Sequence, residues 1–245
     1  MSAPATANRR LGLFGGSFDP IHGGHLYVAR AAQRAHQLDR VIFVPAARPP
    51  HKPGRELASG PHRLAMVELA IAAEASWSAC DLELYRPGPS YTIDTVLELP
   101  ARVGEADDVE LFLILGSDNL PGLPSWWRVD ELLERVHPIV VPRGAQSAST
   151  AGESTGAGPW PRSVSDEAVP GEADGAQEPD HDALEMPVGL PAKWRAKLAR
   201  GILDVPTAPG RSTDLRAALA AGEVPRDLPV EVLDYIREHG LYFAS

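Results

Sequence analysis

The sequence contains very little cysteine and no long apolar run. Cys80 is the single cysteine among 245 residues, which excludes an internal disulfide framework and suits a reducing cytoplasm. No stretch reaches the roughly 18 apolar residues that a membrane-spanning helix requires. The opening MSAPATANRR has no apolar core of a signal peptide. We therefore expect a cytoplasmic protein without a membrane partner.

Positive charge is also scarce, because 23 Lys and Arg stand against 33 Asp and Glu, a net charge of −10. Most of the excess falls in residues 144–190, which hold nine acidic residues and one base, Arg162. This segment is rich in Gly, Ala, Ser and Pro and has no hydrophobic period, so its burial cannot offset the entropy of ordering it. We expect a disordered, low-complexity acidic insertion there. The remaining chain is nearly neutral and has no basic stripe, which permits a small anionic ligand but disfavours long nucleic acid.

Two common nucleotide-binding fingerprints are missing: the chain has neither a Walker A loop nor a G-x-G-x-x-G turn. It has instead the stretch LFGGSFDPIHGGHL at 13–26. Its glycine pair lets the backbone approach a ligand closely, and a helix that begins near Gly24 offers N–H groups to an anion. His22 and His25 lie one turn apart and can face the same pocket.

Apolar runs and amphipathic stretches alternate along the chain. Strands are predicted at 10–16, 40–46, 78–84, 109–116 and 137–143. Helices are predicted at 25–38, 62–75, 92–104 and 125–135, and after a stretch at 201–207 the pattern continues at 212–222 and 229–241. Pro61 falls in a first helical turn, Ser125 is placed as an N-cap, and Gly104 closes a helix.

This alternation predicts an α/β fold with a doubly wound parallel sheet, Rossmann-like, in one domain over 1–245 that contains the acidic insertion. In such sheets the ligand binds beyond the carboxyl ends of the strands, near a topological switch point. Four segments fall at those ends: 15–16, 45–52, 116–118 and 206–212. We expect them to form one site.

Several motifs resemble those of a known superfamily. His22-Gly23-Gly24-His25 resembles the H-x-G-H signature of the nucleotidyltransferases, and STDLR at 212–216 is similar to their Ser-Thr-x-x-Arg motif. Three further stretches resemble the bacterial nicotinate-nucleotide adenylyltransferase family: PPHK at 49–52, SYTIDT at 90–95 and LGSDNLPGLPSWW at 115–127. The resemblance covers about 11–143 and 201–240. It implies ATP and nicotinate mononucleotide as substrates, and deamido-NAD and pyrophosphate as products.

In adenylyl transfer a phosphate monoester attacks the α-phosphorus of ATP, and this nucleophile is already anionic at neutral pH. The protein therefore has to position the reactants and stabilise charge on phosphate oxygens. The resemblance implies a set of catalytic residues: His22, His25, Lys52 and Arg216. It implies ATP contacts by Gly15, Gly16, Ser17, Phe18, Gly24, Gly116, Asp118, Ser212 and Thr213. Mg²⁺ bound mainly through the phosphates would need few protein carboxylates.

For the acceptor, the resemblance implies that Thr92 contacts the pyridine carboxylate and that Trp126 stacks on the ring. Trp127 matches an aromatic residue whose backbone N–H meets the carboxylate. An indole beside a helix N-terminus offers a flat apolar face and anion-binding amides. Because consecutive helical residues point about 100° apart, we expect at least one of the two tryptophans to be a core or staple residue.

Simpler interpretations remain open. Asp19 can cap a turn whose histidines face water or a backbone carbonyl, and a zinc ion at the two histidines would lack further ligands at matching spacing. Asp118 can be a strand-end turn residue, and Lys52 a solvated charge. Arg216 can pair with Asp214 or another acidic residue.

Two other functions also remain open. Phosphopantetheine adenylyltransferase, from the same superfamily, more often has Thr where His22 stands, and it would not need the SYTIDT and SWW stretches. A nucleotide-binding regulator without turnover is the second. Arg211 stands where the family commonly has Ser, which puts the geometry of that loop in question.

Overall fold

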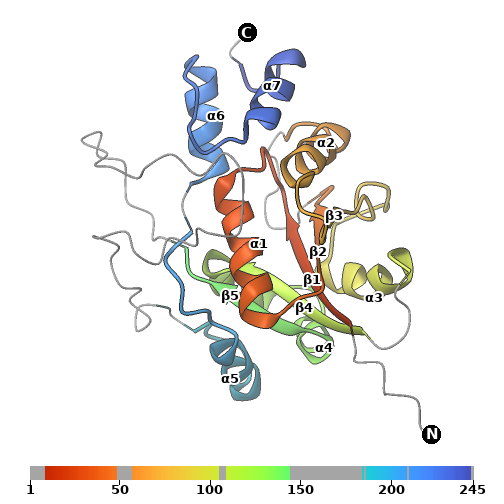
Figure 1. Ribbon diagram of the computed structural model, residues 1–245. Helices are drawn as coiled ribbons and strands as arrows, with labels where there is room; N and C mark the ends of the chain where they lie inside the picture. The colour runs from red at the N-terminus through yellow and green to blue at the C-terminus, as the bar shows by residue number, and fades with distance from the viewer. Residues whose placement is uncertain are drawn as a thin grey trace, which may run out of the picture.

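The computed structural model describes residues 9–48, 57–104, 109–143, 184, 186–208 and 210–243. Within them, one sheet of parallel strands has the order β3-β2-β1-β4-β5 (Figure 1). Its strands are β1 (Arg9–Gly16), β2 (Arg40–Pro45), β3 (Trp77–Ala79), β4 (Val109–Gly116) and β5 (His137–Val141). The predicted doubly wound parallel sheet is confirmed.

Helices cover both faces of this sheet. They are α1 (Gly23–His36), α2 (Gly60–Ile71), α3 (Thr92–Arg102), α4 (Val129–Arg135), α5 (Ala192–Arg200), α6 (Ser212–Ala220) and α7 (Val230–Glu238), with a 3₁₀ segment η1 (Ser117–Ser125). Successive strand residues face opposite layers: Leu13 packs with α3 and α4, whereas Phe14 packs with α1, α2, α6 and α7. This two-sided burial explains why the strands read as continuous apolar runs.

Local signals in the sequence placed several elements correctly. Strand β4 occupies the predicted residues 109–116. Pro61 lies in the first turn of α2, where its missing N–H costs no hydrogen bond. Gly104 follows α3 with a φ of +75°, a conformation that glycine adopts without strain.

The predicted helix at 125–135 begins too early. Residues 117–125 form η1, which contains Pro121 and Pro124, and Ser125 donates to the carbonyl of Gly122 rather than capping a helix. Helix α4 begins only at Val129, after Arg128 in a left-handed conformation with φ +53°. The two tryptophans at 126 and 127 therefore precede the helix, and their side chains are not related by the 100° rotation of helical neighbours.

Three other parts of the chain add to or differ from the predicted pattern. The third strand is shorter than predicted, because only Trp77–Ala79 pairs with β2. Ile202 and Ala208 make isolated bridges to Val140 of β5 and to Arg143, and residues 201–207 form no strand. Helix α5 was not predicted, although its Trp194 and Leu198 are buried at i,i+4 spacing.

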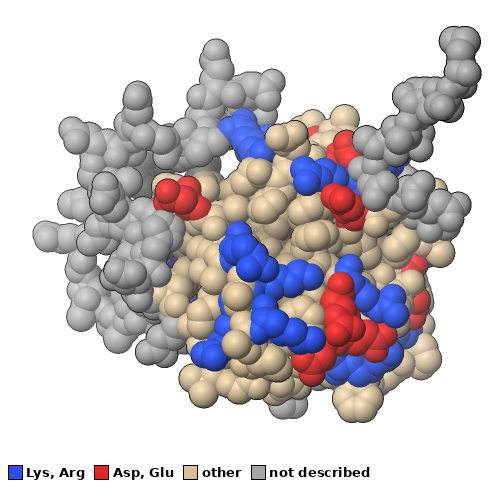
Figure 2. Space-filling view, turned by 90° about the horizontal axis from the view of Figure 1, so that it is seen from below, with Lys and Arg blue, Asp and Glu red and all other residues tan. Residues whose placement is uncertain are grey.

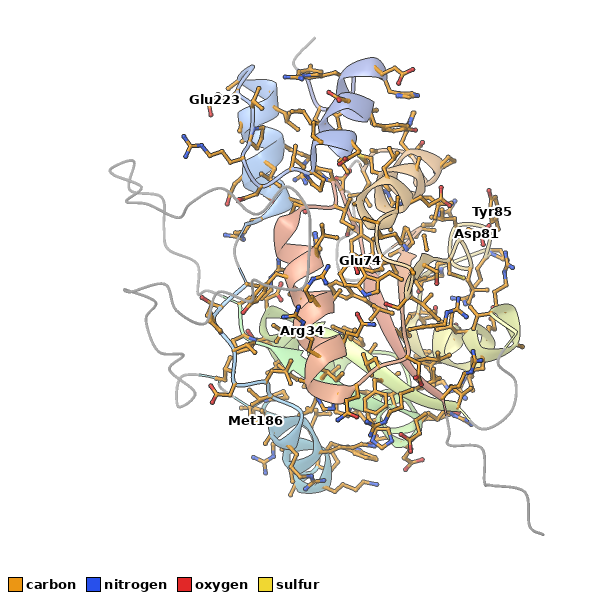
Figure 3. The ribbon with its side chains drawn as sticks, in the orientation of Figure 1. Arg34, Glu74, Asp81, Tyr85, Met186 and Glu223 are labelled. Atoms are coloured by element: carbon orange, nitrogen blue, oxygen red, sulfur yellow. The ribbon has the colours of Figure 1, made fainter. Side chains whose placement is uncertain are left out.

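Of the predicted acidic insertion 144–190, residues 144–183 and 185 lie outside the described residues. Its last residues belong to the core, contrary to the predicted boundary. Leu190 is buried and Met186 partly buried in a cluster with Trp194 of α5. Figure 3 labels Met186 close to this helix. Two isolated apolar side chains give no periodic signal, so the sequence pattern did not reveal this packing.

Helices α6 and α7 lie together beyond the end of β1 (Figure 1). The N–H of Gly23, at the start of α1, donates to the carbonyl of Asp227 at 2.8 Å. On the face seen from below, Lys and Arg side chains lie among Asp and Glu (Figure 2). Across the described part of the chain, no helix has both the length and the apolar character needed to cross a bilayer.

Candidate active site

The candidate site lies where β1 and β4 end. Strand β1 pairs with β2 on one side and with β4 on the other. Because the strand order changes direction between β1 and β4, the connections that leave them diverge and open a place for a ligand. The predicted segments 15–16 and 116–118 are at these two strand ends.

His22 is buried at the start of α1 and forms its N-cap. Its Nδ1 accepts a hydrogen bond from the N–H of Gly24 at 3.2 Å, whereas its buried Nε2 has no hydrogen-bond partner. Burial, and to a smaller extent the positive charge of Arg143, lowers the pKa of His22 to about 3. The ring is therefore neutral at pH 7 and carries its proton on Nε2. It offers one hydrogen-bond donor to a ligand rather than a positive charge.

His25 lies directly beside His22, with ring centroids 3.9 Å apart. Its Nδ1 accepts from the N–H of His22 at 3.3 Å, and the edge of its ring meets Phe18. The two histidines thus form a reciprocal capping box on α1. Their capping bonds fix both rings on one side of the β1–α1 loop.

The two glycines that end β1 have different surroundings. A Cβ on Gly15 would meet no atom within 4 Å, whereas one on Gly16 would approach the Phe18 ring to 3.0 Å. Phe18 is buried and has a φ of +46°, and the carbonyl of Ser17 accepts from Arg63 at 2.7 Å. The loop is therefore rigidly held, with open space in front of Gly15.

Arg143, just beyond β5, is a site residue that the sequence analysis missed. Its guanidinium lies 3.7 Å from the Asp118 carboxylate and 3.5 Å from the Gly210 carbonyl, and its N–H donates to Ser117. A Cβ on Gly116 would meet its Cδ at 2.6 Å. The sequence did offer a signal for Arg143, because this basic residue directly follows a buried strand.

Helix α6 brings the STDLR motif at 212–216 to the loop that leads into His22. The hydroxyl of Ser212 donates to the carbonyl of Pro20 at 3.1 Å, across 192 positions. Arg216 donates to the Asp19 carbonyl at 2.6 Å and pairs with the Asp19 carboxylate at 3.5 Å. It also donates to the Thr213 hydroxyl at 3.4 Å. Arg216 thus pairs with an acid other than Asp214.

Three residues beside the two motifs have contacts of their own or lie at the surface. The Oδ1 atom of Asp19 accepts from the N–H of Ala58 and from the Tyr242 hydroxyl. Arg211 is exposed and precedes α6 without a side-chain capping bond. Gly24 donates its N–H to His22, so that group serves the cap.

Lys52 and the PPHK stretch lie outside the described residues. The residues that lead to them are held in place. Ala46 donates to the Gly16 carbonyl at 2.9 Å, and the N–H groups of Ala47 and Arg48 both donate to the buried Ser90 hydroxyl. The SYTIDT stretch therefore begins with a residue that fixes the loop after β2.

The predicted acceptor residues form a second group around the start of α3. Thr92 is its first residue, and Tyr91 before it lies with its ring 5.8 Å from that of Trp127. Trp127 is 58% exposed. Trp126 is half-buried and packs against two apolar clusters, one with α3 and one with α5. Trp126 is therefore part of the apolar core and is also partly exposed to solvent.

Within the described residues, no three His, Cys, Asp or Glu side chains group closely enough to hold a metal ion. Both histidine Nδ1 atoms accept backbone hydrogen bonds, which occupies one ligating nitrogen of each ring.

Comparison with known proteins gives full-length matches. The family described as Cytidylyltransferase-like matches residues 13–217. The chain is 39% identical over 243 residues to a probable nicotinate-nucleotide adenylyltransferase from Synechococcus sp. (strain JA-3-3Ab), covering 99% of each chain. It is 40% identical over 238 residues to the protein of that name from Pseudomonas fluorescens, covering 96% of this chain and 98% of the relative.

Among solved structures, the fold is similar to that of Plasmodium falciparum nicotinic acid mononucleotide adenylyltransferase complexed with NaAD. The TM-score is 0.65 at 16% identity, with 96% of this chain and 97% of the other covered. A putative nicotinate-nucleotide adenylyltransferase from Vibrio parahaemolyticus gives a TM-score of 0.57 at 16% identity, with 97% of each chain covered. At 16% sequence identity, this structural similarity establishes the fold alone.

Proposed function

The chain belongs to the nicotinate-nucleotide adenylyltransferase family, and we propose that it transfers the adenylyl group of ATP to nicotinate mononucleotide. The products are deamido-NAD and pyrophosphate. The structural observation that carries this proposal is the neutral, buried His22 at the start of α1, whose Nε2 donor lacks a partner. An unpartnered buried donor is costly, and a phosphate oxygen of a bound nucleotide would satisfy it.

The reaction requires positioning more than proton transfer. A phosphate oxygen of the acceptor forms a bond to the α-phosphorus as the bond to the β-phosphate oxygen breaks, and pyrophosphate leaves. Since the nucleophile is already ionised, the site needs donors and cations directed at the phosphate oxygens. The two histidines, the backbone at 15–17 and the start of α6 supply such donors.

His22 and His25 are assigned to the α- and β-phosphates, with His25 toward the bridging oxygen. Their rings lie side by side at the N-terminus of α1, whose dipole favours an anion. As a neutral donor, His22 stabilises charge on phosphate oxygens without needing to be protonated itself. This arrangement keeps the donor in place across the neutral pH range.

Positive charge is supplied by Arg216, Arg143 and Lys52. Arg216 contacts Asp19 in the loop before His22, and the charge of Arg143 acts on His22. Lys52 is assigned to the phosphates by its motif. Ser212 and Thr213, in the first turn of α6, are assigned to the β- and γ-phosphates. We propose that the divalent cation is Mg²⁺, which neutralises triphosphate charge and is held mainly by phosphates and water.

The remaining ATP contacts are assigned to the two strand ends. Gly15 leaves open space for the nucleotide, and Gly16, Ser17 and Phe18 continue the loop. On β4, Gly116 permits the close approach of Arg143, and the exposed Asp118 carboxylate suits the ribose hydroxyls. Gly24 contributes by donating its N–H to His22, the N-cap of α1.

Acceptor recognition is assigned to Thr92, Trp126 and Trp127. The α3 N-terminus favours a carboxylate, and an indole face suits the pyridine ring. Trp126 is assigned to stacking, and the backbone N–H of Trp127 to the carboxylate. The Tyr91 ring lies beside the Trp127 ring, with the ring centroids 5.8 Å apart.

The test is coupled pyrophosphate release with ATP and, in turn, nicotinate mononucleotide, nicotinamide mononucleotide and phosphopantetheine. We expect the largest kcat/KM with nicotinate mononucleotide. Release with phosphopantetheine alone would identify the superfamily rival. ATP binding without release for any acceptor would favour a regulator.

A further inference from the structure

A buried carboxylate lies beside the histidine pair. Asp19 is 1% exposed, and a buried charge requires compensation by donors or by an opposite charge. Its Oδ1 accepts from the Tyr242 hydroxyl at 2.7 Å and from the N–H of Ala58 at 3.1 Å. Its Oδ2 lies 3.5 Å from the Arg216 guanidinium. Asp19 thus joins the end of the chain to the β1–α1 loop.

Tyr242 reaches Asp19 from the C-terminal end, four residues after α7. Its backbone has a φ of +66°, a conformation that costs a non-glycine residue about 1 kcal/mol or more. Such a conformation persists where the surroundings demand it, here where the hydroxyl meets Asp19. Burial and the negative charge of Asp19 raise the pKa of Tyr242 well above its ordinary value, so the hydroxyl keeps its proton and donates.

The two donors on Oδ1 orient the carboxylate. With Oδ1 turned to Tyr242 and Ala58, Oδ2 is the oxygen that faces Arg216. The Asp19 carbonyl accepts from the same guanidinium at 2.6 Å. Two groups of one residue therefore fix where Arg216 stands, and Tyr242 controls the orientation of one of them.

The same region is braced from the other side by Arg63. This buried guanidinium donates to the carbonyls of Ser17 at 2.7 Å and Ala58 at 2.9 Å. Ala58 in turn donates its N–H to Asp19. With the rest of the loop held in this way, the Tyr242 hydroxyl is the contact that a single conservative substitution removes.

We propose that Tyr242 is a positioning residue of the adenylyl-transfer site, which acts through Asp19 to orient the Arg216 guanidinium for the triphosphate. The inference rests on the proposed function. A merely structural Tyr242 would pin the end of the chain and change stability alone. A positioning Tyr242 would change the use of ATP and leave the use of the acceptor unchanged.

The test compares Tyr242→Phe with Tyr235→Phe. The control removes a tyrosine hydroxyl from the same end of the chain, one that contacts His62 at 2.9 Å, away from Asp19. For Tyr242→Phe we expect kcat/KM for ATP to fall by about tenfold, the scale of a hydrogen bond to a charged group. The KM for nicotinate mononucleotide should not change. Tyr235→Phe should keep both constants.

Coupling to Arg216 is measured by a double-mutant cycle with Arg216→Lys. If Tyr242 acts through Asp19 on Arg216, adding Tyr242→Phe to Arg216→Lys should reduce kcat/KM for ATP less than twofold further. Full additivity would overturn the proposal, and so would wild-type ATP constants in Tyr242→Phe. Calorimetric titration of ATP without acceptor gives a second measure, with weaker affinity expected for Tyr242→Phe. This titration tests the inference even if no acceptor supports turnover. A lack of turnover would refute the proposed function and leave the inference standing.

Discussion

The N–H of Gly24 donates to Nδ1 of His22, and this one bond makes the helix cap and fixes the tautomer of the imidazole. The proton is thereby assigned to Nε2, the buried atom that lacks a partner. His22 therefore has a structural role through Nδ1 and a proposed chemical role through Nε2. Mutations can separate the two roles.

Replacing His22 with Asn should separate capping from catalysis. Asn is a strong N-cap residue, so His22→Asn should keep the stability of α1, whereas His22→Ala should lose about 1 kcal/mol of unfolding free energy. Both lack the Nε2 donor, and both should lower kcat by about 100-fold or more. Urea unfolding and pyrophosphate release measure the two effects. Wild-type turnover in His22→Asn would remove His22 from the mechanism.

The depressed pKa of His22 makes stability depend on pH. The native ring titrates near pH 3, whereas an unfolded histidine titrates near 6.5. Between these values the unfolded chain binds a proton that the native state does not, so stability falls as the pH drops below about 6.5. The limiting slope is about 1.4 kcal/mol per pH unit. Unfolding of the wild type and His22→Asn between pH 5 and 7.5 should give the variant a shallower slope; equal slopes would contradict the expectation.

Arg143 should affect kcat/KM for ATP and not the use of the acceptor. Its charge lies beside Asp118 and acts on His22, so Arg143→Gln should lower kcat/KM for ATP by about 10- to 100-fold. Arg135→Gln is the control, because it breaks a surface pair with Glu131, which contributes little. A similar loss in both variants would indicate a general effect of charge instead.

The two tryptophans should respond differently. Trp126→Phe keeps much of the packing between the two clusters but reduces the stacking face, so KM for nicotinate mononucleotide should rise several-fold, by about 1 kcal/mol. Trp127→Ala removes an exposed side chain and leaves the backbone N–H, so its effect on that KM should be smaller. Initial rates at saturating ATP decide between them, and the reverse ranking would assign stacking to Trp127.

We propose that residues 144–183 are an insertion within a single domain. Deleting 148–180 should leave kcat/KM for both substrates within about twofold and the Tm nearly unchanged, since no described core residue is removed. Extending the deletion through Leu190 removes part of the cluster around Trp194 and should lower stability by about 2 kcal/mol or more. Loss of folding in the shorter deletion would refute the insertion.

The sequence by itself determined the elements whose signal is local. Apolar runs placed β1, β2, β4 and β5, and the positions of Pro61 and Gly104 matched the start of α2 and the end of α3. The motifs singled out His22 and His25, and their role at a phosphate site stays a prediction. Ser125 misled because it precedes an amphipathic stretch, while two prolines keep residues 117–125 in a 3₁₀ segment.

Only the tertiary structure decided which distant residues meet. The order β3-β2-β1-β4-β5 brings Arg143 beside Asp118, and the return of the chain through α6 and α7 brings Arg216 and Tyr242 to Asp19. Such contacts join positions up to 223 apart and depend on how whole layers pack, which no local period encodes. The burial that lowers the pKa of His22 has the same origin, because it is a property of the assembled layers rather than of the motif.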